Sequence, residues 1–249
     1  MKLSLALAFL FFVGSVAGWV MELLFRRFLS RANPERKWIN PGFCTGPYVP
    51  LYGFGLCTLF LITSLEERAF LSDPLWNRLL LFGMSAVAMT AIEYIAGILC
   101  LKVAKVRLWD HSDDWGNIQG IICPKFSLIW ALLGGAYAFL IHPRILKALY
   151  WLSNNLAFSF FIGLFFGVFL LDVIHSAQLV VKLKHFADEH QVILRYERVK
   201  SHIRAVHEQT AQQYHFFQPF RSERPLNEHL LNMLATLETR KQERRDARR

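Results

Sequence analysis

The chain carries few charged residues for its length. Asp, Glu, Lys and Arg make up 19% of its 249 residues, and hydrophobic residues make up 54%, with Phe alone at 22 positions. Soluble proteins carry about 25% charged residues. A soluble core of this length cannot bury so many apolar side chains, so the composition excludes both a water-soluble enzyme and a disordered chain.

Several sequence motifs that mark metal sites, nucleotide-binding sites and hydrolases are also absent. The four cysteines, Cys44, Cys57, Cys100 and Cys123, show no C-x-x-C spacing. The sequence contains no G-x-x-x-x-G-K-[ST], no H-E-x-x-H and no G-x-S-x-G. The chain therefore cannot hydrolyse ATP through a P-loop, and we expect reduced thiols, no metal and no cofactor.

Long apolar runs are present instead. A transmembrane helix needs about 20 predominantly apolar residues, and four runs qualify: 3–25, 79–101, 121–141 and 156–181. A fifth run, 52–65, reaches spanning length only if residues 47–51 belong to it. A bent or partly unwound start is expected there, and whether residues 47–65 span fully or are re-entrant stays open. We predict an all-α, polytopic membrane helix bundle of about five spans.

Basic residues flank these runs unevenly. Lys2 alone precedes the first run, whereas five basic residues follow it at positions 26–37, and four more lie between 102 and 125. Residues 66–78 and 142–155 carry only two basic residues each, and we expect them to be outer loops. Because loops rich in Lys and Arg stay in the cytoplasm, we expect an uncleaved first span with the N-terminus outside and the C-terminus inside. The expected parts are a transmembrane bundle over 1–181 and a basic cytoplasmic helical tail over 182–249.

Four titratable side chains, Glu22, Glu93, Asp172 and His175, fall in the cytoplasmic half of the predicted spans. A carboxylate at a helix centre costs about 2.5–3.5 kcal/mol on the insertion scale. Their shared depth predicts one hydrated pocket between the helices. The alternative is that each side chain snorkels or pairs locally, and that alternative is strongest for Glu22.

Two loops carry further unusual residues. The segment 40–55 holds three prolines and four glycines, and such backbone lies at membrane depth only where it faces protein or water, as in transporter sites. An interfacial turn is the alternative. The segment 109–120 holds Asp110, Asp113 and Asp114, which could bind a divalent cation but miss the spacing of a calcium loop. Capped turns and an interfacial Trp109 explain that loop more simply.

A weak internal echo links the two halves. Ser15-x-x-Gly18 precedes Asn40 and Gly42 in the first half, and Tyr94-x-x-Gly97 precedes Asn117 and Gly120 in the second. Two duplicated helical hairpins in one orientation would account for this pattern, as would chance. Tandem hairpins would bring both loops together at the cytoplasmic face.

Taken in order, these motifs resemble a bacterial membrane family described as putative ABC-transporter type IV, or CmpB-like. The resemblance covers about residues 10–135 strongly and Asp172 loosely. It rests on Ser15-x-x-Gly18-Trp19-x-x-Glu22, Asn40-x-Gly42-Phe43-x-x-Gly46-Pro47-x-x-Pro50-x-Tyr52-Gly53-x-Gly55, Glu93-Tyr94-x-x-Gly97, Arg107-x-Trp109-Asp110-x-Ser112, Asn117-x-x-Gly120-x-Ile122-Cys123 and Ser127-x-x-Trp130. The chain departs from the family with Pro41 for Arg, His111 for Tyr and Leu101 for a glutamate.

The resemblance implies a permease-like protein of the bacterial inner membrane. The candidate polar site comprises Glu22, Glu93, Tyr94, Asp110, Asp172 and His175. The loop motifs beside it comprise Asn40, Gly42, Gly46, Pro47, Pro50, Tyr52, Gly53, Trp109, Ser112, Asn117 and Gly120. Expected partners are membrane lipid, a separate ATPase subunit and a second copy of the chain, without nucleic acid.

The tail contains two short stretches in which apolar residues recur at the spacing of an amphipathic helix. Val192, Tyr196, Val199, Ile203 and Val206 step by four and three residues, as do Leu226, Leu230, Met233 and Leu237. Two helices joined by a linker over 216–225 could fold on each other, pair with another copy or bind a partner.

Three functions remain open from the sequence. A permease-like transporter component is preferred, because carboxylates in the inner half and a broken helix start are typical of transport. A membrane enzyme acting on lipid or a lipid-linked substrate would use Glu22, Glu93, Asp110 and Asp172 as acids, bases or cation ligands. A non-catalytic sensor or assembly factor would act through the tail.

Overall fold

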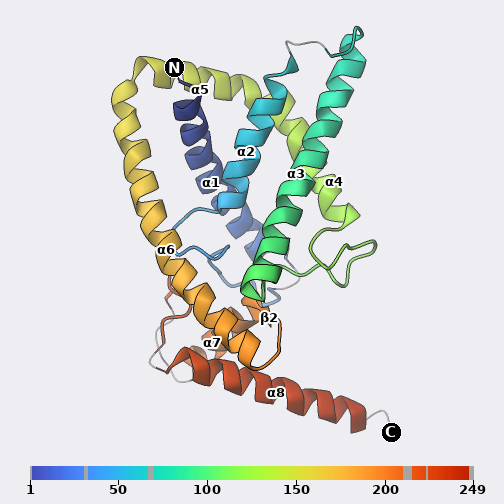
Figure 1. The fold of residues 1–249 in the computed structure, drawn as a ribbon, viewed down its shortest axis with the longest axis vertical. Helices are drawn as coiled ribbons and strands as arrows, with labels where there is room; N and C mark the ends of the chain where they lie inside the picture. Colours follow the sequence, from blue (N-terminus) through green and yellow to red (C-terminus); the bar gives the residue numbers. More distant parts are fainter. Residues whose placement is uncertain (1, 31–32, 67–69, 210–214, 223, 247–249) are drawn as a thin grey trace.

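The computed structural model describes residues 2–30, 33–66, 70–209, 215–222 and 224–246, and this part of the chain is predominantly helical (Figure 1). Six helices form the bundle and its end: α1 (Leu3–Phe28), α2 (Pro50–Thr63), α3 (Pro74–Ala104), α4 (Pro124–Ala136), α5 (His142–Asn154) and α6 (Ser159–Glu189). A π-helical turn, η2 (Tyr137–Ile141), joins α4 to α5, and a 3-10 turn, η3 (Leu156–Phe158), precedes α6. The all-α prediction is confirmed.

Local sequence explains where several helices begin. Pro50 and Pro124 stand in the first turns of α2 and α4, where a missing N–H costs nothing. The Asp73 side chain caps α3 by accepting hydrogen bonds from the backbone N–H groups of Leu75 and Trp76. At the other end of α3, Lys105 adopts the left-handed conformation with φ 56° and stops the helix.

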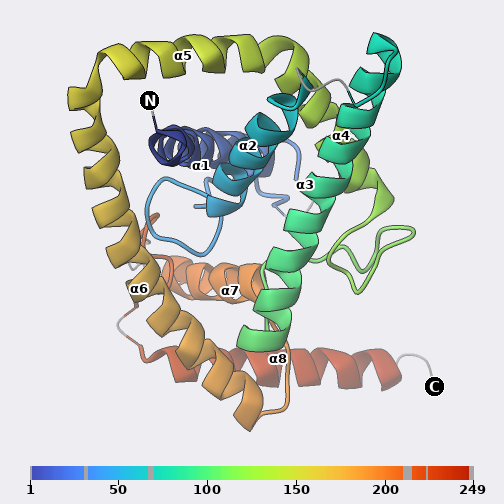
Figure 2. The same cartoon turned by 45° about the horizontal axis from the view of Figure 1, so that its top comes forward.

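Four helical stretches are long and apolar enough to cross a membrane: Leu3–Phe28, Pro74–Ala104, Pro124–Asn154 and Leu156–Glu189. The apolar helix Pro50–Thr63 is shorter, with 14 residues. It lies beside α1 in both ribbon views (Figures 1 and 2). The sequence therefore located the four long spans, while the fifth run is a short helix preceded by the non-helical loop 41–49.

One connection differs from the prediction. Residues 142–155 were expected to be an outer loop, but most of them form α5, which lies across the end of the bundle (Figure 2). The π-helical turn and Pro143 mark the change of direction. Ile145, Leu149 and Leu152 bury one face of α5 against the bundle, so this amphipathic helix closes the end where α1 begins.

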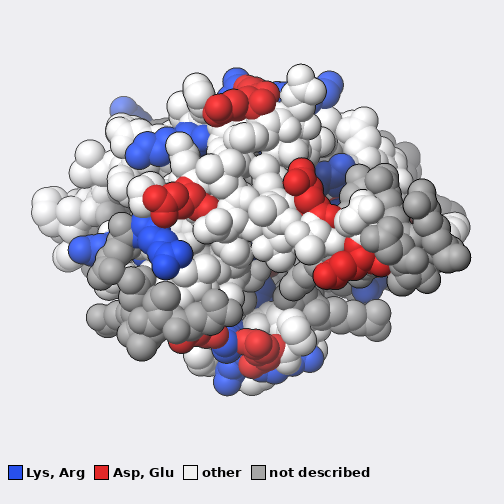
Figure 3. Space-filling model, turned by 90° about the horizontal axis from the view of Figure 1, so that it is seen from below, with Lys and Arg blue, Asp and Glu red and all other residues white. Residues whose placement is uncertain are grey.

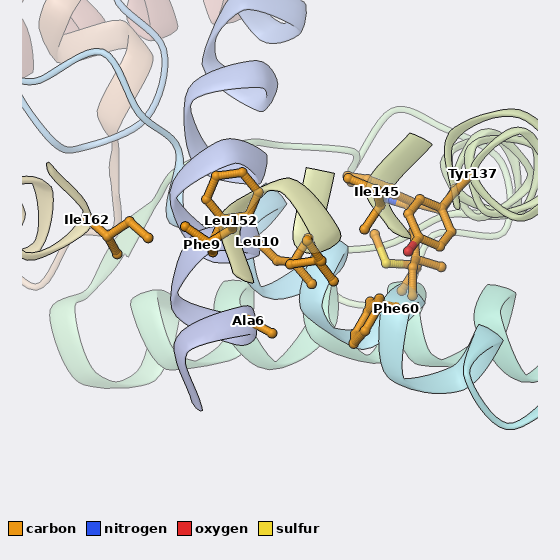
Figure 4. Close-up of a cluster of buried hydrophobic side chains, with 12 residues drawn as sticks. Ala6, Phe9, Leu10, Phe60, Tyr137, Ile145, Leu152 and Ile162 are labelled. Atoms are coloured by element: carbon orange, nitrogen blue, oxygen red, sulfur yellow. The ribbon is translucent and has the colours of Figure 1, made fainter. Parts of the chain in front are cut away.

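That end carries the apolar core shown in Figure 4. Each of the helices α1 to α6 contributes to it together with η2. The labelled members are Ala6, Phe9, Leu10, Phe60, Tyr137, Ile145, Leu152 and Ile162. The N-terminus thus lies at the end opposite α7 (Tyr196–Gln209) and α8 (Leu226–Asp246) (Figure 1).

Two glycines of the internal echo occupy the close contacts of the two hairpins. A Cβ at Gly18 would come within 2.2 Å of Tyr52 Cβ at the start of α2, and a Cβ at Gly97 would come within 2.2 Å of Ile121 Cγ2, shortly before α4. Only glycine fits such an approach. Gly18 and Gly97 hold matching positions in the echo, but their partners do not, since Tyr52 is the third residue of α2 and Ile121 precedes α4 by three residues.

The tail folds back on the end of the bundle. α7 and α8 pack together with the last turns of α6 in a second core that includes Leu183, Tyr196, Ile203 and Leu230. β2 (Leu194–Arg195) pairs in parallel with β1 (Val106–Arg107), the segment that follows α3. α7 and α8 fold on each other, which is one of the three arrangements that the sequence left open, and Val192 precedes the first of these helices. Acidic and basic side chains are interspersed on this end, seen from below in Figure 3.

Candidate functional site

Two aromatic side chains, the half-buried Tyr52 and the buried Trp130, connect Glu22 with Glu93. The Tyr52 hydroxyl on α2 donates to Glu22 Oε2 on α1 at 2.9 Å, and Trp130 Nε1 on α4 donates to Glu93 Oε2 on α3 at 2.9 Å. The Tyr52 and Trp130 rings meet with centroids 5.4 Å apart. The two hairpins therefore touch through one chain of polar and aromatic contacts, which we call the acidic link (Glu22, Tyr52, Trp130, Glu93).

The two acids of the link differ in their surroundings. Glu93 is 5% exposed, so its carboxylate depends on Trp130 and on His111, whose Nε2 lies 4.0 Å from Glu93 Oε1. Glu22 has a cation beside it, because Arg26 Nε lies 2.9 Å from Glu22 Oε1 one turn further along α1. The link therefore contains one ion-paired acid and one acid without a bonded cation among the described residues.

Arg26 extends the link into the tail. Its guanidinium also contacts Glu197 on α7 at 2.9 Å, and Glu197 lies 3.5 Å from Lys200 Nζ. Burial would raise the pKa of Glu197, but the charges of Arg26 and Lys200 hold it below its usual value. Burial lowers the pKa of Lys200 to about 8, against the raising effect of Glu197.

Lys200 fastens the tail to the first loop. It is 3% exposed, and its ammonium donates to the carbonyl oxygens of Asn40 at 3.0 Å and Gly42 at 2.8 Å. Asn40 in turn accepts from Trp19 Nε1 at 2.7 Å and donates to the Thr45 carbonyl at 3.1 Å. The loop 40–49 is therefore a folded unit between α1 and α7.

Asp172 holds this loop on its other side. Its carboxylate accepts hydrogen bonds from both the backbone and the hydroxyl of Thr45, from the Gly46 backbone, and from the hydroxyls of Tyr48 and Ser176. Five donors around one carboxylate stabilise its charged form without a cation. Asp172 thus anchors the loop to α6, and none of these bonds involves Glu22 or Glu93.

The second loop is braced by its own side chains. Asp110 accepts from Arg107 at 3.1 Å and from the Ser112 backbone at 3.1 Å, and it pairs with Arg195 of β2 at 2.8 Å. Burial would raise the pKa of Asp110, but the bonds from Ser112 and the two arginine charges lower it. Asn117 donates to the carbonyls of Ser112 and Asp114 and accepts from the Gly120 backbone. These residues shape the loop, and Arg195 ties it to the tail.

The structure therefore divides the predicted site residues into groups. Glu22, Glu93 and Tyr52 belong to the acidic link, Asp172 belongs to the first loop, and Asp110 belongs to the second. His175 is exposed and Tyr94 is half-buried, and neither has a recorded bond to the link. Pro47 and Pro50 end the loop, and Gly46 and Gly53 allow its close packing against Tyr48 and Ser15.

The cavities found in the described part of the chain lie elsewhere. One of about 240 Å³ is lined by residues of α2, α3, α4 and η2, including Thr63, Ser85 and Gly134. Another of about 390 Å³ is bordered by Ile62, Gly83 and Val87. Neither lining includes a member of the acidic link.

Three contributors were missed in the sequence. Trp130 and Arg26 both belong to recognisable patterns, since Trp130 continues the spacing Ser127-x-x-Trp130 and Arg26 follows Glu22 by four residues. Lys200 gives no such signal, because its partners are backbone carbonyls about 160 positions away.

The long apolar helices and the polar groups held between them define a helical membrane protein. The family described as putative ABC-transporter type IV matches residues 9–177, and the chain belongs to that family. Searches of the curated proteins and of the solved structures find no match to this chain.

Proposed function

We propose that the chain is a permease-like component of an ATP-driven transporter in the inner membrane of a bacterium, with Glu22 and Glu93 at its working site. The observation that carries this proposal is the acidic link. Its hydrogen bonds join α1 to α2 and α3 to α4, while the contact between Tyr52 and Trp130 joins the two hairpins.

Such a link suits a site that opens and closes. Carboxylates in a spanning segment are costly and are typically found where they act on a substrate, an ion or a proton. A relative shift of the hairpins would separate Tyr52 from Trp130 and expose both acids. Two carboxylates, of which only Glu22 is paired with a guanidinium, favour a cationic or hydrogen-bonding substrate over an anion.

ATP hydrolysis would come from a separate subunit, since the chain has no P-loop. The loops 33–49 and 105–123 lie at the same end of the molecule as α7 and α8 (Figure 1). An ATPase that docks at this end would contact the tail and both loops together. It would reach the acidic link through Arg26, which contacts both Glu22 and Glu197.

The test is to purify the chain from its own membranes with its associated ATPase and to measure ATP hydrolysis in liposomes. Glu93→Gln is expected to lower the turnover at least about tenfold, since it removes a charge that only the working site requires. Glu66→Gln is the matched control, because Glu66 is an exposed acid that pairs with Arg78 in the connection between α2 and α3.

Two results would contradict the proposal: reproducible purification without any ATPase, or equal turnover in Glu93→Gln and wild type. The contacts of the tail with both loops favour one alternative, a non-catalytic sensor. Loss of cellular function on deletion of residues 196–249, together with full function of Glu93→Gln, would support that alternative.

A further inference from the structure

Three side chains with metal-ligating atoms converge beside Glu93. They are His111 and Asp114 in the second loop and Cys123, the residue that precedes α4. The ligand atoms offered by the three all lie within 4.8 Å of one another. Cys123 is 2% exposed, and the other two side chains are half-buried.

The backbone brings these residues together. His111 and Asp114 share a turn in which the Asp114 N–H donates to the His111 carbonyl at 2.9 Å. The loop then returns through a bond from the His111 N–H to the Gly120 carbonyl at 2.9 Å, and a bridge between Ile118 and Ile122 leads into Cys123. The three side chains are therefore placed by a hairpin that needs no ion to close.

The two ring nitrogens of His111 face different partners. Nδ1 lies 3.3 Å from Asp114 Oδ2, within the cluster, while Nε2 lies 4.0 Å from Glu93 Oε1. In metal sites a ligating histidine commonly directs its second ring N–H to a carboxylate that fixes the tautomer and orientation. Glu93 stands where that carboxylate belongs, and Trp130 orients it.

An aromatic ring covers one face of the histidine. The Phe126 ring stacks on the His111 imidazole at 4.2 Å between centroids. Lys125 Nζ lies 3.9 Å from Asp114 Oδ1. The Lys125 side chain is 64% exposed and can turn into solvent. A donor set of nitrogen, sulfur and carboxylate oxygen suits zinc, whereas magnesium and calcium prefer oxygen alone.

We propose that His111, Asp114 and Cys123 bind one zinc ion, with Glu93 orienting His111 from outside the ligand shell. Three protein ligands leave a fourth position for water or another ligand. The site revises the expectation from sequence that the chain holds no metal. It does not depend on the transport role, because the zinc content of the chain can be measured without any transport.

The test uses the full chain, purified in detergent without a histidine tag, stripped with a chelator, loaded with Zn²⁺ and freed of excess metal. Elemental analysis is expected to find about one zinc per chain. Co²⁺ loading should produce the near-ultraviolet absorption of a cobalt–thiolate bond. Cys123→Ser and His111→Gln should lose stoichiometric zinc, and Glu93→Gln should weaken binding about 10–100-fold.

Cys100→Ser and Asp113→Asn are the matched controls, because they alter a cysteine and a carboxylate outside the cluster, and both should retain one zinc. Zinc content that is equal in wild type and in a correctly folded Cys123→Ser variant would overturn the proposal. If Cys123→Ser fails to fold, the cobalt spectrum of the wild type decides: a thiolate band supports the site, and its absence refutes it.

Discussion

Replacing Asp172 with Ala is expected to lower the free energy of unfolding by about 3 kcal/mol and to release the loop 40–49 from α6. Its carboxylate accepts five hydrogen bonds, two of them from backbone N–H groups of Thr45 and Gly46. Hydrogen bonds to a charged group contribute about 1.5–3 kcal/mol each, and part of that loss is offset because freed donors in a half-buried site regain water.

Denaturant unfolding in detergent measures this loss, and limited proteolysis within 40–49 reports the release of the loop. His175→Ala is the control, since His175 lies three residues further along α6 and is exposed. If the two variants unfold at the same denaturant concentration, Asp172 does not anchor the loop.

Arg26→Met is expected to detach α7 from the bundle and to cost about 3–5 kcal/mol. Its guanidinium lies 2.9 Å from a carboxylate oxygen of both Glu22 and Glu197. Removing one partner from a buried ion pair leaves the other charge without compensation. Keeping that charge buried is what destabilises the folded state. Hydrogen exchange of α7 should accelerate, and unfolding should begin at lower denaturant.

Arg27→Met controls for the loss of a neighbouring positive charge. Arg27 lies over the Trp38 ring at 5.2 Å from its centroid, and such a contact contributes about 0.5–1 kcal/mol at an exposed site. The double variant Arg26→Met, Glu197→Met should recover part of the lost free energy of unfolding, because it removes one of the two carboxylates that Arg26→Met leaves without a guanidinium partner. Equal stability of Arg26→Met and Arg27→Met would contradict the role of Arg26.

The sequence was sufficient to predict features that depend on a single helix or a single short segment. The apolar runs located the four long spans, since spanning length and hydropathy are local properties. The loop at 109–120 was predicted to contain capped turns, and Asp110 and Asn117 make those hydrogen bonds. The amphipathic α5 was missed because its 13 residues were assigned to an outer loop.

The contacts between distant segments were less predictable. Depth along the helices suggested that Glu22, Glu93 and Asp172 share a site, but depth does not determine which face of a helix each occupies. Asp172 faces the loop 40–49, whereas Glu93 faces Trp130. Cys123 approaches His111 only through the return of the hairpin at Gly120, which residue spacing alone does not reveal.

The central claim is that Glu22 and Glu93 line a path that opens toward the end carrying the tail. Single cysteines at positions 22 and 93, in a chain whose four native cysteines are replaced by serine, test it through labelling with a membrane-impermeant thiol reagent. We predict labelling of both positions from the cytoplasmic side only, and faster labelling at position 22, because Glu22 is more exposed than Glu93. Labelling from the opposite side, or no labelling of position 93 in any state, would contradict the account.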